Sequence, residues 1–246
     1  MIVNSTEMQN NFGKYLMIAA QEDIVITRNG TAIARLTAIN KEAFSDRGAA
    51  KEIVMEKAAS YHAGGRKASY EEFLELTKNS EDRYEYIDGE IFFLASPRTA
   101  HQIALAELFV IFHSWFQGSK CTPLMAPYDI TLYRTADSIN VVQPDIMVIC
   151  DLEEHLDEDD YYKGVPALVV EIISESTRRK DLVKKLDLYM SCGISEYWIV
   201  NPINREVAVY TFEDKNISRN ITFKNSETAE SCIFEGLTAE LERIFK

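Results

Sequence analysis

A run of apolar residues that ends in a single carboxylate constrains the fold of this chain most. Residues 166–189 read PALVVEIISESTRRKDLVKKLDLY, so a strand-like segment reaches Glu171 just before a segment with helical spacing. A second strand-like run, IMVIC, begins directly after Asp145. If the two strands are neighbours, about 4.8 Å apart, their carboxylates come within a few ångströms of each other.

Two like charges at such a separation require a cation between them. One or two carboxylates, together with waters and a phosphate, are the ligands that Mg²⁺ prefers, and Mn²⁺ accepts the same hard oxygen ligands. Such an ion lowers the pKa of a bound water and stabilises the charge that develops in phosphate hydrolysis. We therefore expect Asp145 and Glu171 to hold Mg²⁺ or Mn²⁺.

The helical segment after Glu171 supplies a lysine for the same site. Two positions after this carboxylate, where a lysine could accompany it directly, the chain has Ile173. Lys185 lies at the border of the expected buried stripe with its aliphatic stem against the core, whereas Lys184 points almost opposite, into solvent. Helical phase, at about 100° per residue, therefore selects Lys185. The stripe itself consists of Leu182, Val183, Leu186, Tyr189 and Met190.

Strand and helix patterns succeed one another from about residue 68 onward. Ser69 and Glu72 have capping-box spacing, Asp88-Gly89 separates two strand-like runs as in a hairpin, and residues 99–116 have helical periodicity. This order predicts an α/β (α+β) domain, residues 68–246, with a mixed sheet flanked by helices. Further strands are expected at 128–133, 145–150, 167–173, 196–200, 207–212 and 221–223, and further helices at 177–191 and 238–244.

Residues 1–45 form a smaller module of their own. An apolar-periodic segment at 8–20 precedes two strand-like runs, 24–26 and 32–36, on either side of Asn29-Gly30, which predicts a helix and a hairpin. Such a module is too small to hold a core alone and needs a partner copy or the rest of the chain. Residues 46–67 are charged and alanine-rich and indicate a linker with one helix.

Composition and charge exclude some classes of protein. With 246 residues, of which 46% are hydrophobic, the chain can bury a core, and its net charge of −13 argues against a protein that coats nucleic acid, although not against a nuclease. Much of the excess charge lies at 151–160, a pattern typical of a solvated loop. No window approaches the roughly 18 apolar residues of a membrane span, and the first residues do not resemble a signal peptide. We expect a cytoplasmic protein that does not enter a membrane.

The cysteines give no sign of a metal cage. Cys121, Cys150, Cys192 and Cys232 are far apart in the sequence and form no CxxC pair. The spacing indicates neither a zinc site nor a disulfide framework, so we expect reduced, partly buried thiols.

Residues 69–202 resemble the Uma-two family of restriction endonucleases, a branch of the PD-(D/E)XK nuclease superfamily. The matching stretches are SYEEF, RYEYIDGEI, SPRTAHQ, QPDIMVIC and PALVVEIISESTRRKDLVKKLDLYMSCGISEYWIVNP. The resemblance implies a PD-(D/E)XK nuclease-like core, a divalent metal on Asp145 and Glu171, and a catalytic lysine that has moved onto the helix, at Lys185. The chain departs from the family at Glu175, where the family usually has a proline between two small hydroxyl residues.

The same resemblance places two more residues near the site. Glu85 would add a metal ligand through water, and His101 would contact phosphate or relay a proton, since the unperturbed pKa of histidine lies near neutrality. Both also have ordinary interpretations, as a polar residue of a hairpin and as a group near a helix start. Arg178 and Arg179 would grip DNA phosphates, or would simply be solvated.

The N-terminal segment, MIVNSTEMQNNFGKYLMIAAQEDIVITRNGTAIARLTAINKE, resembles Phd/YefM-type antitoxins. The resemblance implies a homodimer, operator DNA as a ligand and a cognate toxin as a candidate partner. The toxin-neutralising tail of that family is not recognisable, because the nuclease-like domain occupies its place. The residues that would contact DNA through polar amides, hydroxyls and a lysine are Asn4, Ser5, Thr6, Gln9, Asn10, Asn11 and Lys14.

Two functions compete on this sequence. The first is a Mg²⁺-dependent DNA endonuclease that hydrolyses phosphodiester bonds and carries an antitoxin-like DNA-binding N-terminus. The alternative is a non-catalytic antitoxin and transcriptional autoregulator that uses the nuclease-like fold as a scaffold. The presence of Asp145, Glu171 and Lys185 together argues against a mere scaffold. The net negative charge of the chain mildly favours one.

Overall fold

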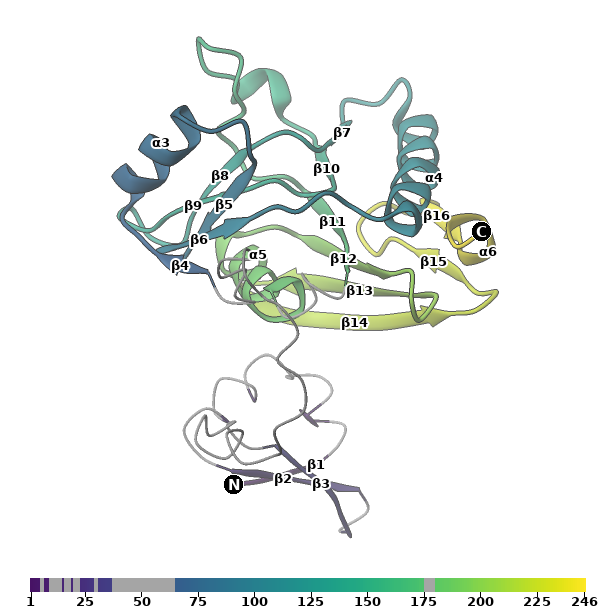
Figure 1. Ribbon diagram of the computed structural model, residues 1–246. Coiled ribbons are helices and arrows are strands. Elements are labelled where there is room, and N and C mark those ends of the chain that lie inside the picture. Colours follow the sequence, from purple (N-terminus) through teal and green to yellow (C-terminus); the bar gives the residue numbers. More distant parts are fainter. Residues whose placement is uncertain are drawn as a thin grey trace, which may run out of the picture. The chain divides into compact units, whose positions relative to one another are not determined.

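The computed structural model describes residues 1–4, 7–8, 15, 19, 23–28, 31–36, 65–174 and 180–246 (Figure 1). The chain divides into two compact units, Met1–His62 and Ala63–Lys246. The division falls inside the segment that we expected as a linker, residues 46–67. Arg66 and Lys67, the last residues of that segment, form the short strand β4 (Arg66–Lys67) of the larger unit.

The smaller unit contains a three-stranded sheet. β2 (Ile24–Arg28) and β3 (Thr31–Leu36) pair antiparallel, which confirms the predicted hairpin strands, and β1 (Ile2–Asn4) adds to β2 in parallel. Of the expected helix at 8–20, the described residues Met8, Tyr15 and Ala19 are helical. These three pack with Val3 and Ile24 into a small core.

A six-stranded mixed sheet, called the main sheet below, is the basis of the larger unit. Its strand order is β14-β13-β12-β11-β10-β7, with β11 and β12 parallel and the other neighbours antiparallel. The strands are β7 (Thr122–Met125), β10 (Ile146–Ile149), β11 (Leu168–Ile172), β12 (Glu196–Asn201), β13 (Glu206–Glu213) and β14 (Asn216–Lys224). With its flanking helices, this sheet confirms the predicted α+β class.

A second, antiparallel sheet of five strands has the order β4-β6-β5-β9-β8. Its hairpin β5–β6 turns at Asp88 and Gly89, whose positive φ angles of 49° and 76° are those that a tight turn of this type requires. The hairpin was predicted from that dipeptide. The remaining strands of the larger unit are β5 (Tyr84–Ile87), β6 (Glu90–Phe93), β8 (Ile130–Tyr133), β9 (Ile139–Val142), and the separate pair β15 (Thr228–Glu230) and β16 (Thr238–Glu240).

Helices cover both faces of the main sheet (Figure 1). Helix α4 (Thr99–Phe116) has the predicted bounds and packs with α6 (Leu241–Ile244) on one face, where Ile146 and Val148 point. The residues between them in β10, Met147 and Ile149, point to the other face, toward α5 (Leu186–Cys192). Because strand side chains alternate, Glu171 lies on the α5 face with Val169.

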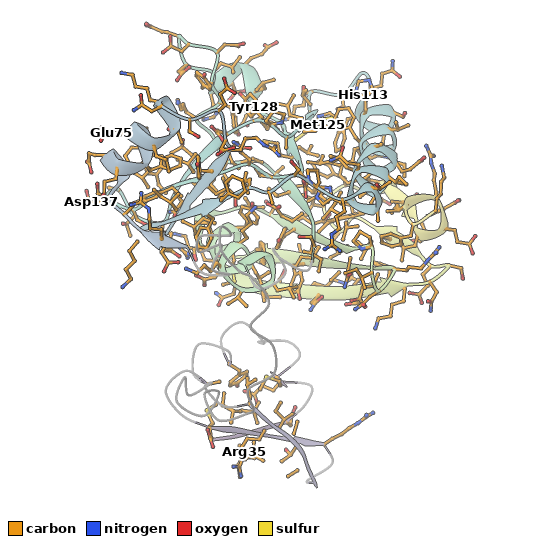
Figure 2. The ribbon with its side chains drawn as sticks, in the orientation of Figure 1. Arg35, Glu75, His113, Met125, Tyr128 and Asp137 are labelled. Atoms are coloured by element: carbon orange, nitrogen blue, oxygen red, sulfur yellow. A yellow bond between two sulfur atoms is a disulfide. The ribbon has the colours of Figure 1, made fainter. Side chains whose placement is uncertain are left out.

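Helix α3 (Tyr70–Lys78) covers the second sheet and buries Phe73 against Tyr86 and Ile91. Its predicted capping box is confirmed: Ser69 Oγ accepts a hydrogen bond from the Glu72 amide, and the Glu72 carboxylate accepts one from the Ser69 amide. The outer sides of the covering helices carry exposed residues, such as Glu75 on α3 and His113 on α4 (Figure 2).

Some elements were missed or misplaced by the sequence prediction. β7 contains Pro123 and lies at the edge of the main sheet, where a missing amide is tolerated, so its pattern is not strand-like. β9 was also missed. Residues 238–240, expected as the start of a helix, pair as β16 with β15, and α6 begins only at Leu241. Pairing with a distant strand overrides the local helical pattern in that segment.

The expectation of four reduced cysteines is wrong for two of them. Cys121 and Cys150 form a disulfide across 29 positions of sequence. The antiparallel pairing of β7 and β10 sets Thr122 opposite Ile149, and so brings the two flanking cysteines together. Cys192 and Cys232 are thiols of intermediate burial, as predicted.

No helix in the described ranges has both the length and the apolar character that a membrane crossing demands.

The capping box of α3 gives a stability prediction. Replacement of Ser69 by Ala removes the acceptor for the Glu72 amide and should lower the free energy of unfolding by about 1 kcal/mol, measured by urea unfolding. Ser69→Thr keeps the oxygen and should stay close to the parent. Equal losses in the two variants would contradict a role of the cap.

Candidate active site

Asp145 and Glu171 lie at the adjacent ends of two neighbouring strands of the main sheet, Asp145 directly before β10 and Glu171 near the end of β11. β10 and β11 are antiparallel with Ile146 opposite Val170, and the same register, continued by one residue, sets Asp145 opposite Glu171. The Asp145 carboxylate reaches across this pair, where Oδ2 accepts a hydrogen bond of 2.7 Å from the Ile172 amide. The Asp145 carboxylate therefore lies beside the backbone of β11 next to Glu171.

A buried lysine reaches these strand ends from the next helix. The Nζ atom of Lys185 lies 2.6 Å from Glu171 Oε1 and 2.7 Å from Glu85 Oε1. The side chains of Lys185 and Glu85 are 2% and 0% exposed. A buried charge costs several kcal/mol unless it is paired, so these three charges are stable in the interior only together.

Local helix geometry places Lys185 at this position. The π-helical turn η3 (Lys180–Lys185) runs directly into α5. Lys185 and Tyr189 are four residues apart, which puts them on one face of the helix, and both contact Glu171. A π-helical turn contains more residues than an α-helical turn, because its hydrogen bonds join residues five apart. Leu182 and Val183, which lie within this turn, are only half-buried.

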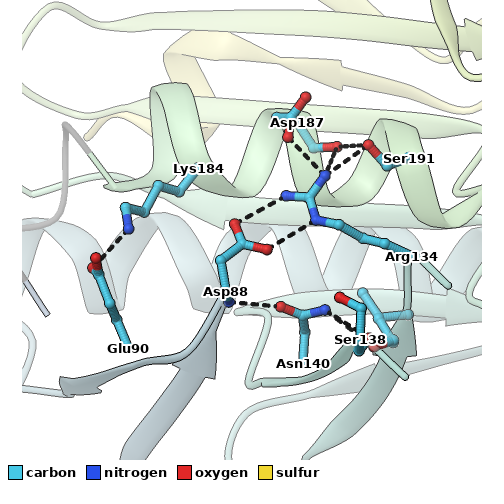
Figure 3. Close-up of polar contacts among 9 residues, drawn as sticks. Asp88, Glu90, Arg134, Ser138, Asn140, Lys184, Asp187 and Ser191 are labelled. Carbon is cyan, nitrogen blue, oxygen red and sulfur yellow. Dashed lines mark hydrogen bonds and ion pairs between the residues drawn. The ribbon is translucent and has the colours of Figure 1, made fainter. Parts of the chain in front are cut away.

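The expectation for Lys184 is wrong. Lys184 was expected to point into solvent, but its side chain is only 35% exposed and has partners within the protein. Its Nζ forms an ion pair of 2.7 Å with Glu90 (Figure 3). The same atom lies 5.1 Å from the centre of the Phe92 ring. The sequence phase gave the correct side of the helix, whereas the partner on the β5–β6 hairpin comes from a distant part of the chain.

Tyr189 is a member of the site that sequence reasoning assigned only to the apolar stripe. Its hydroxyl donates a 2.6 Å hydrogen bond to Glu171 Oε1. Burial, reinforced by the negative charge of Glu171, raises the pKa of Tyr189 well above its usual value, so the hydroxyl keeps its proton and remains a donor. The four-residue spacing from Lys185 was the signal that could have identified it.

Glu85 reaches the site from the second sheet. In addition to Lys185, its Oε1 accepts a 3.0 Å hydrogen bond from the Gln143 amide. Gln143, Pro144 and Asp145 are the three residues that connect β9 of the second sheet to β10 of the main sheet. The site therefore lies where the chain passes from one sheet to the other, and Glu85 is a buried partner of the lysine rather than an ordinary hairpin residue.

His101 lies in the first turn of α4 and contacts Asp145. Its Nε2 is 3.2 Å from Asp145 Oδ2, and the two side chains are 13% and 16% exposed. Within the described part of the chain, Nδ1 of this histidine is buried and lacks a hydrogen-bond partner. The N-cap position of α4 is Arg98, whose side chain makes no cap hydrogen bond.

The expected DNA contacts lie largely beyond what the structure describes. Asn4 ends β1, and its Oδ1 accepts a hydrogen bond of 2.8 Å from the Glu7 amide, a local contact within the smaller unit. The other candidates lie outside the described residues: Ser5, Thr6, Gln9, Asn10, Asn11, Lys14, Arg178 and Arg179.

Asp145 and Glu171 are the residues that were expected to hold Mg²⁺ or Mn²⁺. No group of three or more His, Cys, Asp or Glu side chains among the described residues is arranged to hold a metal. Mg²⁺ does not need one, because it keeps several waters and binds through one or two carboxylates and substrate phosphate. Among the described residues, the Ile172 amide and His101 Nε2 both contact Oδ2 of the Asp145 carboxylate. Oδ1 is therefore the oxygen that could meet a cation next to Glu171.

Comparison with known proteins identifies relatives of the larger unit. The family model Uma2, described as putative restriction endonuclease, matches residues 70–242. An uncharacterized protein of Synechocystis is 26% identical over 165 residues, which cover 67% of this chain and 84% of the relative. A crystal structure described as a putative nuclease belonging to DUF820, from Anabaena variabilis, is similar in fold, with a TM-score of 0.58 and 20% identity over 71% of this chain and 96% of that one.

The buried charges make a matched pair of lysine variants informative. Lys185→Met leaves Glu85 and Glu171 buried without their shared cation and should lower the free energy of unfolding by roughly 3–5 kcal/mol. Lys184→Met removes only the partly exposed pair with Glu90 and should cost about 1 kcal/mol or less. Urea unfolding of both variants measures the difference, and similar losses would show that Lys185 does not balance a buried charge.

Proposed function

The chain belongs to the Uma2 family of putative restriction endonucleases, and on this premise we propose that its larger unit hydrolyses phosphodiester bonds of DNA with the help of Mg²⁺ or Mn²⁺. The fold of the Anabaena variabilis protein, described as a putative nuclease, supports the same class of activity. As a DNA-acting enzyme it would work in the cytoplasm.

The convergence of Asp145, Glu171 and Lys185 carries this proposal. Asp145 directly precedes β10, Glu171 lies in β11 and Lys185 ends η3. This proposal is supported by the hydrogen bond of the Asp145 carboxylate with the amide next to Glu171 and by the ion pair of Lys185 with Glu171. Buried ionic groups contribute little net stability compared with well-packed apolar residues of similar size. A scaffold would gain little from this arrangement, whereas hydrolysis of a phosphodiester uses each of its charges.

Each residue has a distinct proposed role. Asp145 and Glu171 would hold the divalent metal, which when bound supplies Lewis acidity toward a water and a phosphate oxygen. Lys185, a point charge held by Glu85 and Glu171, would orient the attacking water or stabilise the negative charge on the phosphate in the transition state.

The polar groups around these three residues would support them. Tyr189 keeps Glu171 in place through its hydroxyl. His101, whose Nε2 contacts Asp145, would contact a phosphate oxygen or relay a proton. Glu85 would hold Lys185 and could reach the metal through a water.

The smaller unit is proposed to dimerise and to bind DNA. Its sheet and its core of Val3, Met8, Tyr15, Ala19 and Ile24 are consistent with the antitoxin-like module that the N-terminal sequence resembles. DNA contacts would come from the N-terminal polar residues, and Arg178 and Arg179 would add phosphate contacts. A cognate toxin would be a further partner of this unit.

Carboxylate variants test the proposed activity. The parent should bind Mg²⁺ or Mn²⁺ by calorimetry and cleave DNA from a mixed set of substrates. Asp145→Asn and Glu171→Gln keep the size of each side chain but lose its charge, so metal binding should disappear and cleavage should fall roughly 100-fold or more.

Asp151→Asn is the matched control, because Asp151 follows the opposite end of β10 and bonds Tyr162 instead. It should bind metal and cleave like the parent. If the Asp145 and Glu171 variants also cleave like the parent, the assigned site is wrong. Absence of cleavage and of metal binding in the parent, together with operator binding by residues 1–45, would instead support the non-catalytic autoregulator.

A further inference from the structure

Arg134, directly after β8, links the β5–β6 hairpin to helix α5 (Figure 3). Its guanidinium holds Asp88 at the hairpin turn through two hydrogen bonds, Nε to Oδ1 at 3.0 Å and Nη2 to Oδ2 at 3.2 Å. On the helix side, Nη1 donates to Asp187 Oδ2 and to Ser191 Oγ, each at 2.7 Å, and lies 3.3 Å from the Asp187 carbonyl oxygen. One side chain therefore connects two segments that are distant in sequence.

This link is stronger than an ordinary surface ion pair. The Arg134 side chain is only 18% exposed, and its contact with Asp88 is bidentate, which fixes geometry as well as charge. Burial alone would lower the pKa of Arg134, but the carboxylates of Asp187 and Asp88 outweigh it and raise the pKa. The guanidinium therefore stays charged.

The turn that Arg134 holds is itself anchored. The Asp88 amide donates a 2.9 Å hydrogen bond to Oδ1 of Asn140, which is fully buried in β9. The side-chain nitrogen of Asn140, Nδ2, donates in turn to the carbonyl oxygens of Ser138 at 3.2 Å and Leu132 at 3.4 Å. Asp88 is thus a fixed point of the second sheet, and Arg134 connects that point to the helix.

The same two segments meet again inside the active site. Glu85 lies on β5 three residues before Asp88, and Lys185 lies two residues before Asp187. Asp187 and Ser191, four residues apart, share one face of α5, while Lys185 and Tyr189 share another. Arg134 therefore holds the helix from a different side than the one on which Lys185 meets Glu85 and Glu171.

We propose that Arg134 is a positioning residue of the active site: by fixing the Asp88 turn to Asp187 and Ser191, it keeps Glu85 and Lys185 in register, and so keeps the lysine amino group on Glu171. The catalytic consequence rests on the proposed nuclease function, whereas the placement of Lys185 does not. Misplacement of a catalytic group by about 1 Å costs roughly 100-fold in rate, so a small slip of α5 is sufficient.

The test uses the full-length chain with ¹³C-labelled lysine and follows the Lys185 Cε signal by NMR, assigned by its loss in Lys185→Arg. Arg134→Met should move this signal away from its position in the parent. Arg134→Lys keeps the charge but not the planar guanidinium, so it should move the signal less. Arg243→Met is the control, because Arg243 also joins two helices, α6 and α4, through a carboxylate, Glu107, with a more exposed side chain (46%). It should leave the Lys185 signal in place.

Cleavage kinetics provide a second readout. Arg134→Met should lower kcat for Mg²⁺-dependent DNA cleavage roughly 10- to 100-fold with KM changed less than about twofold, while Arg243→Met keeps both values. If Arg134→Met does not fold, Asp88→Asn breaks the same contact more mildly and should show the same shift of Lys185.

An unmoved Lys185 signal in a folded Arg134→Met or Asp88→Asn protein would overturn the proposal. So would an equal shift in Arg243→Met, because that result would indicate general loosening of the fold. If the parent cleaves no DNA, the nuclease function fails, while the NMR comparison still decides whether Arg134 positions Lys185.

Discussion

The buried contact of Lys185 with Glu85 and Glu171 is the interaction on which the larger unit depends. Each carboxylate belongs to a different sheet, and the lysine belongs to the helix packed between them and the solvent. None of the three charges can be buried alone without a cost of several kcal/mol. Burial of these three charges therefore requires both sheets and the helix to be docked together, which couples the architecture to the site.

The path of the chain explains why the polar groups gather at this place. Gln143, Pro144 and Asp145 carry the backbone from the second sheet to the main sheet. Within these three residues, a main-chain amide bonds Glu85 and a carboxylate bonds the amide that follows Glu171. The first turn of α4 adds His101 at the same edge. Strand alternation meanwhile keeps the α4 face and the α5 face of the main sheet apolar.

This arrangement relates stability to the proposed chemistry. Membership in the Uma2 family and the similar fold of the Anabaena variabilis protein indicate a nuclease class. The site contains buried charges, and apolar residues of similar size would give the fold at least as much stability if stability were their only role. Arg134 and Lys184 bind the outer side of the same helix to the β5–β6 hairpin. The hairpin and helix are thus joined both inside the site and at the surface.

The sequence by itself determined the features that depend on near neighbours. The Ser69 cap, the Asp88-Gly89 turn and the bounds of α4 follow from spacings of a few residues, and helical phase was sufficient to select Lys185 over Lys184. Only the tertiary structure decided the partners: the ion pair of Lys184 with Glu90, the disulfide of Cys121 with Cys150, and the strands β7 and β16. These contacts join segments far apart in the chain, and no local pattern records which distant segment will supply the other half of a pair.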